Sequence, residues 1–191
     1  MIDEIGFTIT FHTPFRVGTT SGRDGVDITV DREEPLGADH LKGLMRYAAQ
    51  HVLDLPAEVF GAVFGSPGTP SPWAWTAAAA PGGNWGELGA GHRIEIDEVT
   101  HAVREDHLVL GEYLHPTRAE FTVSRHRYLE PADVETHTVI LRCAGAAVHG
   151  LGGWRRRGLG WVGITPAFPV TADDVRILRD LTGAADGHAR T

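Results

Sequence analysis

The sequence has one cysteine, one lysine and no long apolar run. Cys143 is the only cysteine in 191 residues, which excludes an internal disulfide framework and predicts a reducing compartment, the cytoplasm. No apolar stretch approaches the ~20 residues that a membrane-spanning helix needs. The start of the chain, with Asp3 and Glu4, lacks the basic residues of a signal peptide. We therefore expect neither export nor a membrane partner.

Acidic residues are absent from two parts of the chain. The net charge of −8 argues by itself against a nucleic-acid partner. However, residues 136–172 contain no Asp or Glu and four arginines, and residues 40–53 contain no acid and two cations, Lys42 and Arg46. Lys42 is the only lysine among 17 basic residues. A GC-rich genome would produce the same arginine bias, so the positions of the arginines carry more weight than their number.

The length and the periodicity predict one α+β domain. Residues 1–182 are expected to form it, and residues 183–191 a flexible C-terminal tail. The patterns predict strands at 5–17, 73–80, 93–98, 113–123 and 158–170, and helices at 39–53, about 131–151 and 173–181. A polar arm at 99–110 joins two of these strands. This order is typical of a ferredoxin-like fold, an antiparallel sheet with helices on one face.

The most informative segment is a loop at residues 150–160. It holds five glycines around three consecutive arginines, and it lies between a predicted helix and a predicted strand. Glycines let a backbone approach a ligand closely, and arginine forks match phosphate oxygens. A flexible turn with solvated charges is the alternative, and the functional interpretation is favoured because no acid lies nearby. The phosphate-binding residues predicted here are Gly152, Gly153, Arg155, Arg156, Arg157, Gly158 and Gly160.

Two further segments carry candidate residues. Lys42 and Arg46 share one face at the start of the first helix, where an anion is also favoured; a surface helix with two ordinary cations is an equal alternative. The loop at 22–31 contains Asp24, Asp27 and Asp31, which could hold Mg²⁺. For this loop the residues alone favour a solvated polar segment.

Histidine and tryptophan add little at this stage. The 11 histidines form no metal-binding pattern and have no nucleophile beside them. Trp73, Trp75, Trp154 and Trp161 could stack on bases, although core positions are favoured for those on strands.

Three motifs in this order resemble the RAMP (repeat-associated mysterious protein) superfamily of CRISPR-associated proteins. Residues 36–46 are similar to the start of the family's first helix, with its Leu-Lys-Gly core and following Arg. Phe64-Gly65 resembles the pair after that helix, and residues 152–160 resemble the family's glycine-rich signature. Between them, residues 93–97 and 112–121 resemble a strand–thumb–strand section. The resemblance spans about residues 5–168.

This resemblance implies a modified RNA-recognition-motif-like fold with a protruding thumb hairpin at about 97–111. The implied protein is a guide-RNA-binding subunit of a type III effector complex, similar to the backbone subunits. Its partners would be guide RNA, target RNA, other effector subunits and copies of itself. The resemblance also implies metal-dependent cleavage of target RNA by Asp27, the matching residue and metal ligand, with Asp24 as the second choice and Mg²⁺ as the cofactor. Arg23 joins the predicted RNA-binding residues.

Two other functions remain open from the sequence. A non-catalytic guide-RNA scaffold or terminal cap subunit would use the same arginine loop without cleavage. An endoribonuclease that processes the precursor of the guide RNA is a weaker alternative, because no histidine stands out as a base.

Overall fold

The computed structural model describes residues 3–19, 22, 25–94 and 108–188, with side chains described up to residue 183. Its main element is a four-stranded antiparallel sheet with the strand order β2-β5-β1-β6. The strands are β1 (Glu4–Phe11), β2 (Trp73–Trp75), β5 (Arg118–Arg125) and β6 (Val162–Pro166). The two longest, β1 and β5, lie at the centre.

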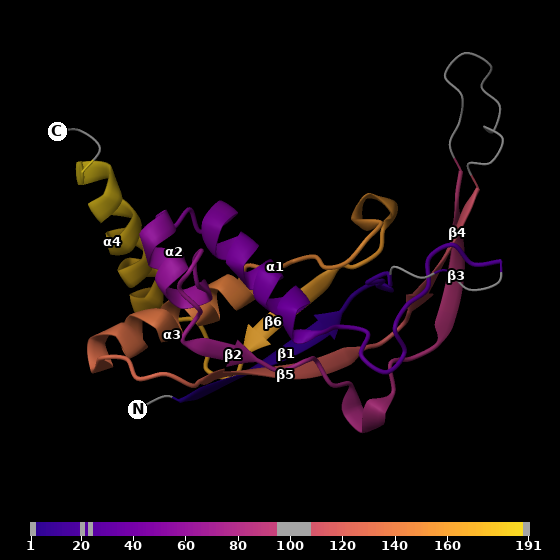
Figure 1. Cartoon of the computed structure of the whole chain (residues 1–191), viewed down its shortest axis with the longest axis horizontal. Coiled ribbons are helices and arrows are strands. Elements are labelled where there is room, and N and C mark those ends of the chain that lie inside the picture. The colour runs from indigo at the N-terminus through magenta and orange to yellow at the C-terminus, as the bar shows by residue number, and fades with distance from the viewer. Residues whose placement is uncertain (1–2, 20–21, 23–24, 95–107, 189–191) are drawn as a thin grey trace, which may run out of the picture.

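Helices connect these strands in a β-α-β-β-α-β pattern and cover one face of the sheet (Figure 1). The helices are α1 (Ala38–His51), α2 (Ala57–Phe64), α3 (Pro131–Ala146) and α4 (Ala172–His188). α1 and α2 lie between β1 and β2, α3 lies between β5 and β6, and α4 packs against α3. This connectivity and strand order are those of a ferredoxin-like fold, as predicted. Within the described residues, no helix has the length and apolar character to cross a membrane.

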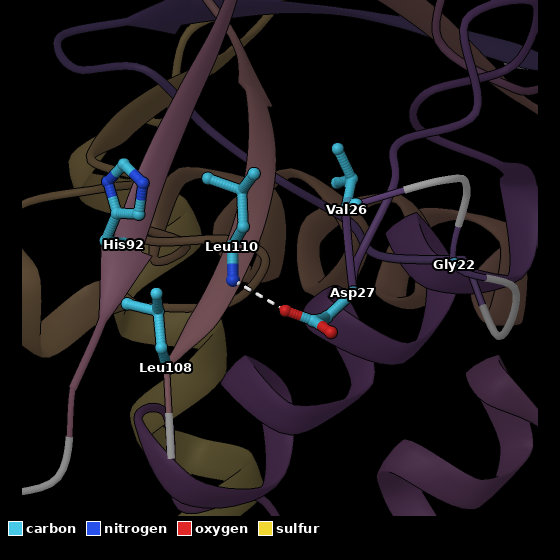
Figure 2. Close-up of a pocket in the computed structure, with 7 residues that line it drawn as sticks. Gly22, Val26, Asp27, His92, Leu108 and Leu110 are labelled. Carbon is cyan, nitrogen blue, oxygen red and sulfur yellow. Dashed lines mark hydrogen bonds between the residues drawn. The ribbon is translucent and has the colours of Figure 1, made fainter. Parts of the chain in front are cut away.

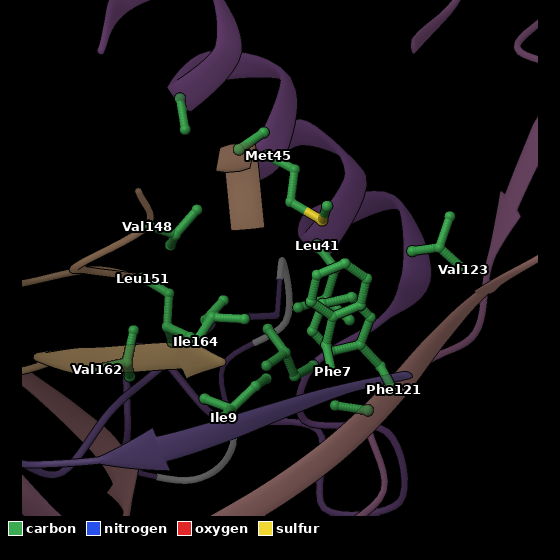
Figure 3. Close-up of a cluster of buried hydrophobic side chains, with 14 of the residues drawn as sticks. Phe7, Ile9, Leu41, Met45, Phe121, Val123, Val148, Leu151, Val162 and Ile164 are labelled. Carbon is green, nitrogen blue, oxygen red and sulfur yellow. The ribbon is translucent and has the colours of Figure 1, made fainter. Parts of the chain in front are cut away.

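The core lies between the sheet and the helices (Figure 3). Alternate residues of β1, including Phe7 and Ile9, are buried because successive strand side chains point to opposite faces. Phe7 is paired in register with Phe121 of β5, and their rings stack with centroids 4.9 Å apart. Leu41 and Met45 of α1 cover this layer from above. Each such side chain contributes about 1.5–3 kcal/mol on burial.

The opposite face of the sheet is polar where β1 and β5 run through it. Thr10 and Glu120 are exposed there, whereas the aromatic residues Phe7, Phe11 and Phe121 are buried in the core. An RNA-recognition motif stacks bases on exposed aromatic residues of its sheet. The central strands of this sheet do not offer such a platform, so the likeness to that motif concerns the topology.

A second, two-stranded sheet stands beyond the end of the main one (Figure 1). It consists of β3 (Leu88–Arg93) and β4 (Val109–Leu114), paired antiparallel from Leu88↔Leu114 to Arg93↔Val109. The predicted thumb at 97–111 lies outside the described residues except for its last four positions, 108–111, which lead into and begin β4.

The strand predictions need five corrections. Two strands are shorter than predicted, because 73–80 contains only β2 (Trp73–Trp75) and 158–170 only β6 (Val162–Pro166). The first strand ends at Phe11, where the chain bends at His12 and Thr13, and Phe15 then bridges to Leu114 of β4. The predicted strand 113–123 is two strands, β4 and β5, separated where Pro116 cannot donate to a ladder. The predicted strand 93–98 starts earlier, at Leu88, and its residues 95–98 lie outside the described residues.

The helix predictions differ mainly at the ends. Gly37, and not Asp39, is the N-cap of α1. Asp39 lies in the first turn, where its negative charge interacts favourably with the helix dipole. α3 ends at Ala146, so the glycines from residue 150 onwards do not cap it; Val148 and Leu151 continue the buried pattern in an extended chain. α2 was not assigned as a helix from the sequence. α4 continues to His188, through the beginning of the predicted tail.

Candidate functional site

The glycine-rich loop presents its three arginines together. Arg155–Arg157 form a single 3₁₀ turn, and all three side chains are exposed. The turn is bracketed by two residues in the left-handed region, Trp154 (φ 57°) and Gly158 (φ 83°). A left-handed conformation is ordinary for glycine but costly for tryptophan. The loop therefore holds Trp154 in a constrained position directly before the cations.

The base of the loop is fixed to the segment that follows β1. The Gly160 N–H donates to the Pro14 carbonyl at 2.7 Å, and the Gly153 N–H donates to the Arg16 carbonyl at 2.9 Å. The carbonyl of Arg16 also lies so close to Gly152 that a Cβ there would collide with it. Gly152 and Gly160 both have positive φ, so the predicted glycines are required by backbone approach within the protein. The result is a firm base with an exposed cationic tip.

Arg16 lies beneath this loop and is 3% exposed. Its guanidinium carbon is 4.2 Å from the centroid of the Trp154 ring, which is a cation–π contact. Burial lowers the pKa of Arg16 below its ordinary value. The sequence interpretation missed this residue because it fell inside a predicted strand. A cation between the apolar residues Phe15 and Val17 was the available signal.

The acidic loop is attached to the two-stranded sheet at β4. The Asp27 N–H donates to the Leu110 carbonyl at 3.0 Å, and the Leu110 N–H donates to Asp27 Oδ2 at 2.7 Å (Figure 2). Asp27 is exposed and lines an open cavity of about 930 Å³ together with His92 of β3 and Leu108. One carboxylate oxygen thus has a structural role, and the side chain as a whole borders open space.

Asp31 Oδ1 accepts the N–H groups of Glu33 and Glu34, each at 2.9 Å. Of the other predicted metal ligands, only Asp27 lies within the described residues. Asp24 and Arg23 lie outside them. In the described part of the chain, no group of three or more His, Cys, Asp or Glu side chains could hold a metal ion. Mg²⁺ needs only one or two carboxylates when waters and substrate phosphates complete its shell. Asp27 fits such a partial site, and the described residues do not form a complete protein cage.

Lys42 and Arg46 contact other parts of the protein. Lys42 Nζ lies 5.6 Å from the centroid of the Trp75 ring of β2. Arg46 Nη1 donates to the Gly65 carbonyl at 2.9 Å, at the end of α2. Residues 42 and 46 are thus directed toward β2 and α2. The structure brings Arg155, Arg156 and Arg157 together, but does not add Lys42 and Arg46 to the same cluster.

A different residue of α1, His40, lies near the arginine loop. Its Nε2 atom is buried and has no hydrogen-bond partner in the described structure. Burial, followed by the positive charge of Arg155, lowers the pKa of His40. No sequence pattern singled it out among 11 histidines. Its position one residue before Leu41-Lys42-Gly43 was the only signal.

The fold and the site define a ferredoxin-like α+β protein with a glycine-framed arginine loop beside a two-stranded sheet. No protein-family model matches the sequence, and no curated protein matches it either. Solved structures do. A chain of the cryo-EM structure of type III-B Cmr-beta in the apo state has a TM-score of 0.67 and 15% identity, covering 88% of this chain and 99% of that chain.

A chain of type III-B Cmr-beta bound to cognate target RNA is also similar. It has a TM-score of 0.65 and 13% identity, and the match covers 94% of this chain and 99% of that one. At these identities the likeness is one of fold. The matches cover 88% and 94% of this chain and 99% of each of the other chains.

Proposed function

We propose that this chain is a guide-RNA-binding subunit of a multi-subunit, type III-like CRISPR effector complex. Three lines of support agree: the ordered motifs of the RAMP superfamily, the fold shared with chains of Cmr-beta assemblies, and the arginine loop. The single observation that carries the proposal is the loop itself, in which Arg155–Arg157 are exposed on a base fixed by backbone hydrogen bonds. Target RNA, other effector subunits and further copies of this chain are partners under the same proposal.

The loop suits a phosphate backbone for electrostatic reasons. Three guanidinium groups are permanently charged, and each presents forked donors that match phosphate oxygens. The segment 136–172 contains no acid that would neutralise them, although the chain as a whole is acidic. Each phosphate neutralised on a single strand changes the slope of log affinity against log salt by about −0.7. The proposed binding is therefore strongly salt-dependent.

The test replaces Arg155, Arg156 and Arg157 together by alanine. The chain is expressed with its neighbouring effector genes, and the RNA that co-purifies is measured by absorbance ratio and sequencing. We expect short RNAs with repeat-derived sequence on the wild type and their loss from the triple variant. The control is Arg176→Ala with Arg179→Ala, which removes two exposed cations from α4 and should retain the RNA. Protein free of RNA in both wild type and control would refute the proposal.

A second candidate activity is cleavage of target RNA, favoured by the position of Asp27 at an open cavity. The ribose 2′-oxygen would bond to the adjacent phosphorus and lose its proton, while the bond from phosphorus to the 5′-oxygen breaks and that oxygen gains a proton. The products would be a 2′,3′-cyclic phosphate and a 5′-hydroxyl. A divalent cation held by Asp27 would offset the charge that develops on the phosphate.

Asp27 requires a variant that keeps its structural hydrogen bond. Asp27→Asn keeps an acceptor for the Leu110 N–H but removes the charge that a cation needs. We expect the assembled complex with Asp27→Asn to retain guide RNA and lose cleavage in the presence of Mg²⁺. Asp27→Ala also loses the contact with β4. Cleavage at the wild-type rate by the Asn variant would assign Asp27 a structural role and favour a non-catalytic scaffold or cap subunit.

A further inference from the structure

Arg16 is a buried cation with no anion beside it among the described residues. Its side chain makes no ion pair with any acid in the described structure, and its Nη1 atom, which is buried, has no hydrogen-bond partner there. The partly buried arginines Arg125 and Arg142 differ, because each is paired with a carboxylate, Asp3 and Asp174 respectively. Arg16 has the Trp154 ring against its guanidinium instead of a carboxylate.

Glycines leave room for the Arg16 guanidinium. Gly111 of β4 lies directly under the guanidinium, since a Cβ there would collide with Arg16 Nη1 and would lie 2.9 Å from the Trp154 ring. Gly18 lies beside Nη2 of Arg16, because a Cβ on Gly18 would be 3.3 Å from that atom. The guanidinium is thus enclosed by Gly18 of its own segment, by the two-stranded sheet and by the glycine-rich loop. Three segments that are far apart in the sequence meet at this one side chain.

An unpaired buried charge lowers stability, and an apolar side chain of similar volume often serves the fold better. Such a group therefore calls for a reason outside the packing of the fold. Burial already disfavours the charged form, as the lowered pKa of Arg16 indicates. A phosphate would supply the missing negative charge and two hydrogen-bond acceptors for the fork.

Building on the proposed function, we propose that Arg16 is a phosphate-binding residue that Trp154 covers in the free protein and uncovers when RNA binds. The exposed arginines at 155–157 would first attract the RNA backbone. Displacement of the Trp154 ring would then open Nη1 to one phosphate. The cation–π contact is exchanged for a charge-assisted hydrogen bond, and the buried charge gains its partner.

The local backbone supports such a movement of Trp154. The residue has a left-handed conformation that tryptophan rarely adopts. Gly158 follows the 3₁₀ turn and a Cβ there would have nothing within 4 Å, so this side of the loop tip tolerates new backbone angles. Trp154 is also adjacent in the chain to Arg155. Contacts that draw the arginines toward a phosphate therefore act directly on the covering ring.

The test is Arg16→Met in the full chain, with a fluorescently labelled single-stranded RNA as the probe. Methionine fills a similar volume without charge. We expect a Tm equal to or above that of the wild type, because an unpaired buried charge is removed. We expect the RNA affinity to fall about tenfold or more, since hydrogen bonds to charged groups are the strong ones. The slope of log affinity against log salt should become shallower by about 0.7.

Arg16→Lys provides a second variant that keeps the charge and removes the fork. It should lose affinity while retaining the wild-type salt slope. Arg142→Met is the matched control, because it removes a buried arginine that already has a carboxylate; it should lower the Tm and leave the salt slope unchanged. A lowered Tm for Arg16→Met with an unchanged salt slope would identify Arg16 as a structural residue and overturn the inference.

The covering role of Trp154 is tested separately in the wild-type chain. Protein labelled with 5-fluorotryptophan has five ¹⁹F signals, one for each tryptophan, and Trp154→Phe identifies the signal of interest. We expect RNA to move the Trp154 signal, and an unmoved signal in RNA-saturated protein would overturn the inference. If the triple arginine variant loses RNA while Arg16→Met does not, this inference fails and the proposed function stands. If the triple variant binds normally, the proposed function itself fails.

Discussion

Two buried arginines at opposite ends of the molecule are held in different ways. Arg142 of α3 donates through Nη2 to Asp174 of α4 and through Nη1 to the Pro169 carbonyl at 3.1 Å. The second oxygen of Asp174 accepts the N–H and the hydroxyl of Thr171. Arg16, by contrast, has the face of Trp154 and three glycine positions around it, and no carboxylate among the described residues.

The difference distinguishes a charge that holds the fold together from a charge that is available to a ligand. At the α3–α4 end, the carboxylate and the guanidinium form an ion pair that joins α4 to α3, although Arg142 Nε has no hydrogen-bond partner in the described structure. At the loop end, positive charge from Arg16 and Arg155–Arg157 has no acid beside it in the described structure. Removing one member of a buried ion pair destabilises the fold strongly, although the intact pair adds little over an apolar replacement. An unpaired cation is instead available to bind an anion.

The largest effect is expected from Arg142→Met. The change leaves the Asp174 carboxylate, which is 4% exposed, without its cation. Removing one member of a buried pair costs about 3–5 kcal/mol, and urea unfolding monitored by far-UV circular dichroism measures the loss. Arg16→Met should show no loss in the same experiment. Equal destabilisation by the two variants would break the comparison.

A double variant separates the effect of the Asp174 charge from the effect of its hydrogen bonds at the start of α4. Asp174 and Thr171 bond reciprocally at the start of α4, which is a capping arrangement. Asp174→Asn keeps an acceptor for Thr171 and removes the charge. Arg142→Met with Asp174→Asn should therefore recover most of the lost stability, and failure to recover would show that the arginine acts through packing.

Two glycine-to-alanine changes give the next largest effect. At Gly145 of α3, a Cβ would lie 2.7 Å from the Phe7 ring, which is stacked on Phe121 and cannot yield. Overpacking of this kind costs about 1–3 kcal/mol. At Gly111 the new methyl meets the end of the flexible Arg16 side chain, so the cost of Gly111→Ala should be smaller.

A double-mutant cycle distinguishes the two glycine sites. Arg16→Met removes the guanidinium that the Gly111 methyl would meet but not the Trp154 ring, which lies 2.9 Å from the would-be Cβ. It should therefore cancel part of the cost of Gly111→Ala and none of the cost of Gly145→Ala. Unfolding free energies from urea titrations give the coupling. Additive effects of Arg16→Met and Gly111→Ala would place the guanidinium away from Gly111.

The central fold was predictable because its signals are local. The alternation along β1, with Phe7 and Ile9, and the helical face of α1 each follow from a repeating pattern. The ends of elements were less predictable, since they depend on contacts across the fold. α3 stops at Ala146 although the apolar pattern continues, because Val148 and Leu151 are buried in an extended segment beside β6.

The site was predictable where composition marks it and hidden where tertiary contacts create it. Five glycines around three arginines identified the loop, and the structure keeps those arginines together. Lys42 seemed equivalent from spacing, but its direction toward Trp75 is set by how α1 packs. The neighbours of Arg16 come from its own segment and from two distant ones, β4 and the glycine-rich loop, so no local pattern could reveal its surroundings.

The smallest effect concerns two histidines, one in each region. Burial lowers the pKa of His40, with a further contribution from Arg155, and burial lowers the pKa of His137, opposed by Asp133. For both, the folded state holds its proton less tightly than the unfolded state. Their contribution to stability is therefore complete above about pH 6.5, the ordinary histidine value, and is lost as the pH falls through the lowered pKa.

Arg155→Ala should separate these two histidines. It removes a positive charge near His40 and should raise the His40 pKa slightly, because burial, the larger cause, remains. His137 is the internal control, since its Nδ1 accepts the Trp73 indole N–H at 3.1 Å in the helical layer. NMR titration of the histidine ring protons measures both values in one sample. A shift of both pKa values would indicate a change in the whole fold, and a shift of neither would mean that Arg155 points away from α1. A shift of His40 alone would place the arginine loop against the start of α1 in solution, and would make His40 a direct reporter of any phosphate that Arg155 binds.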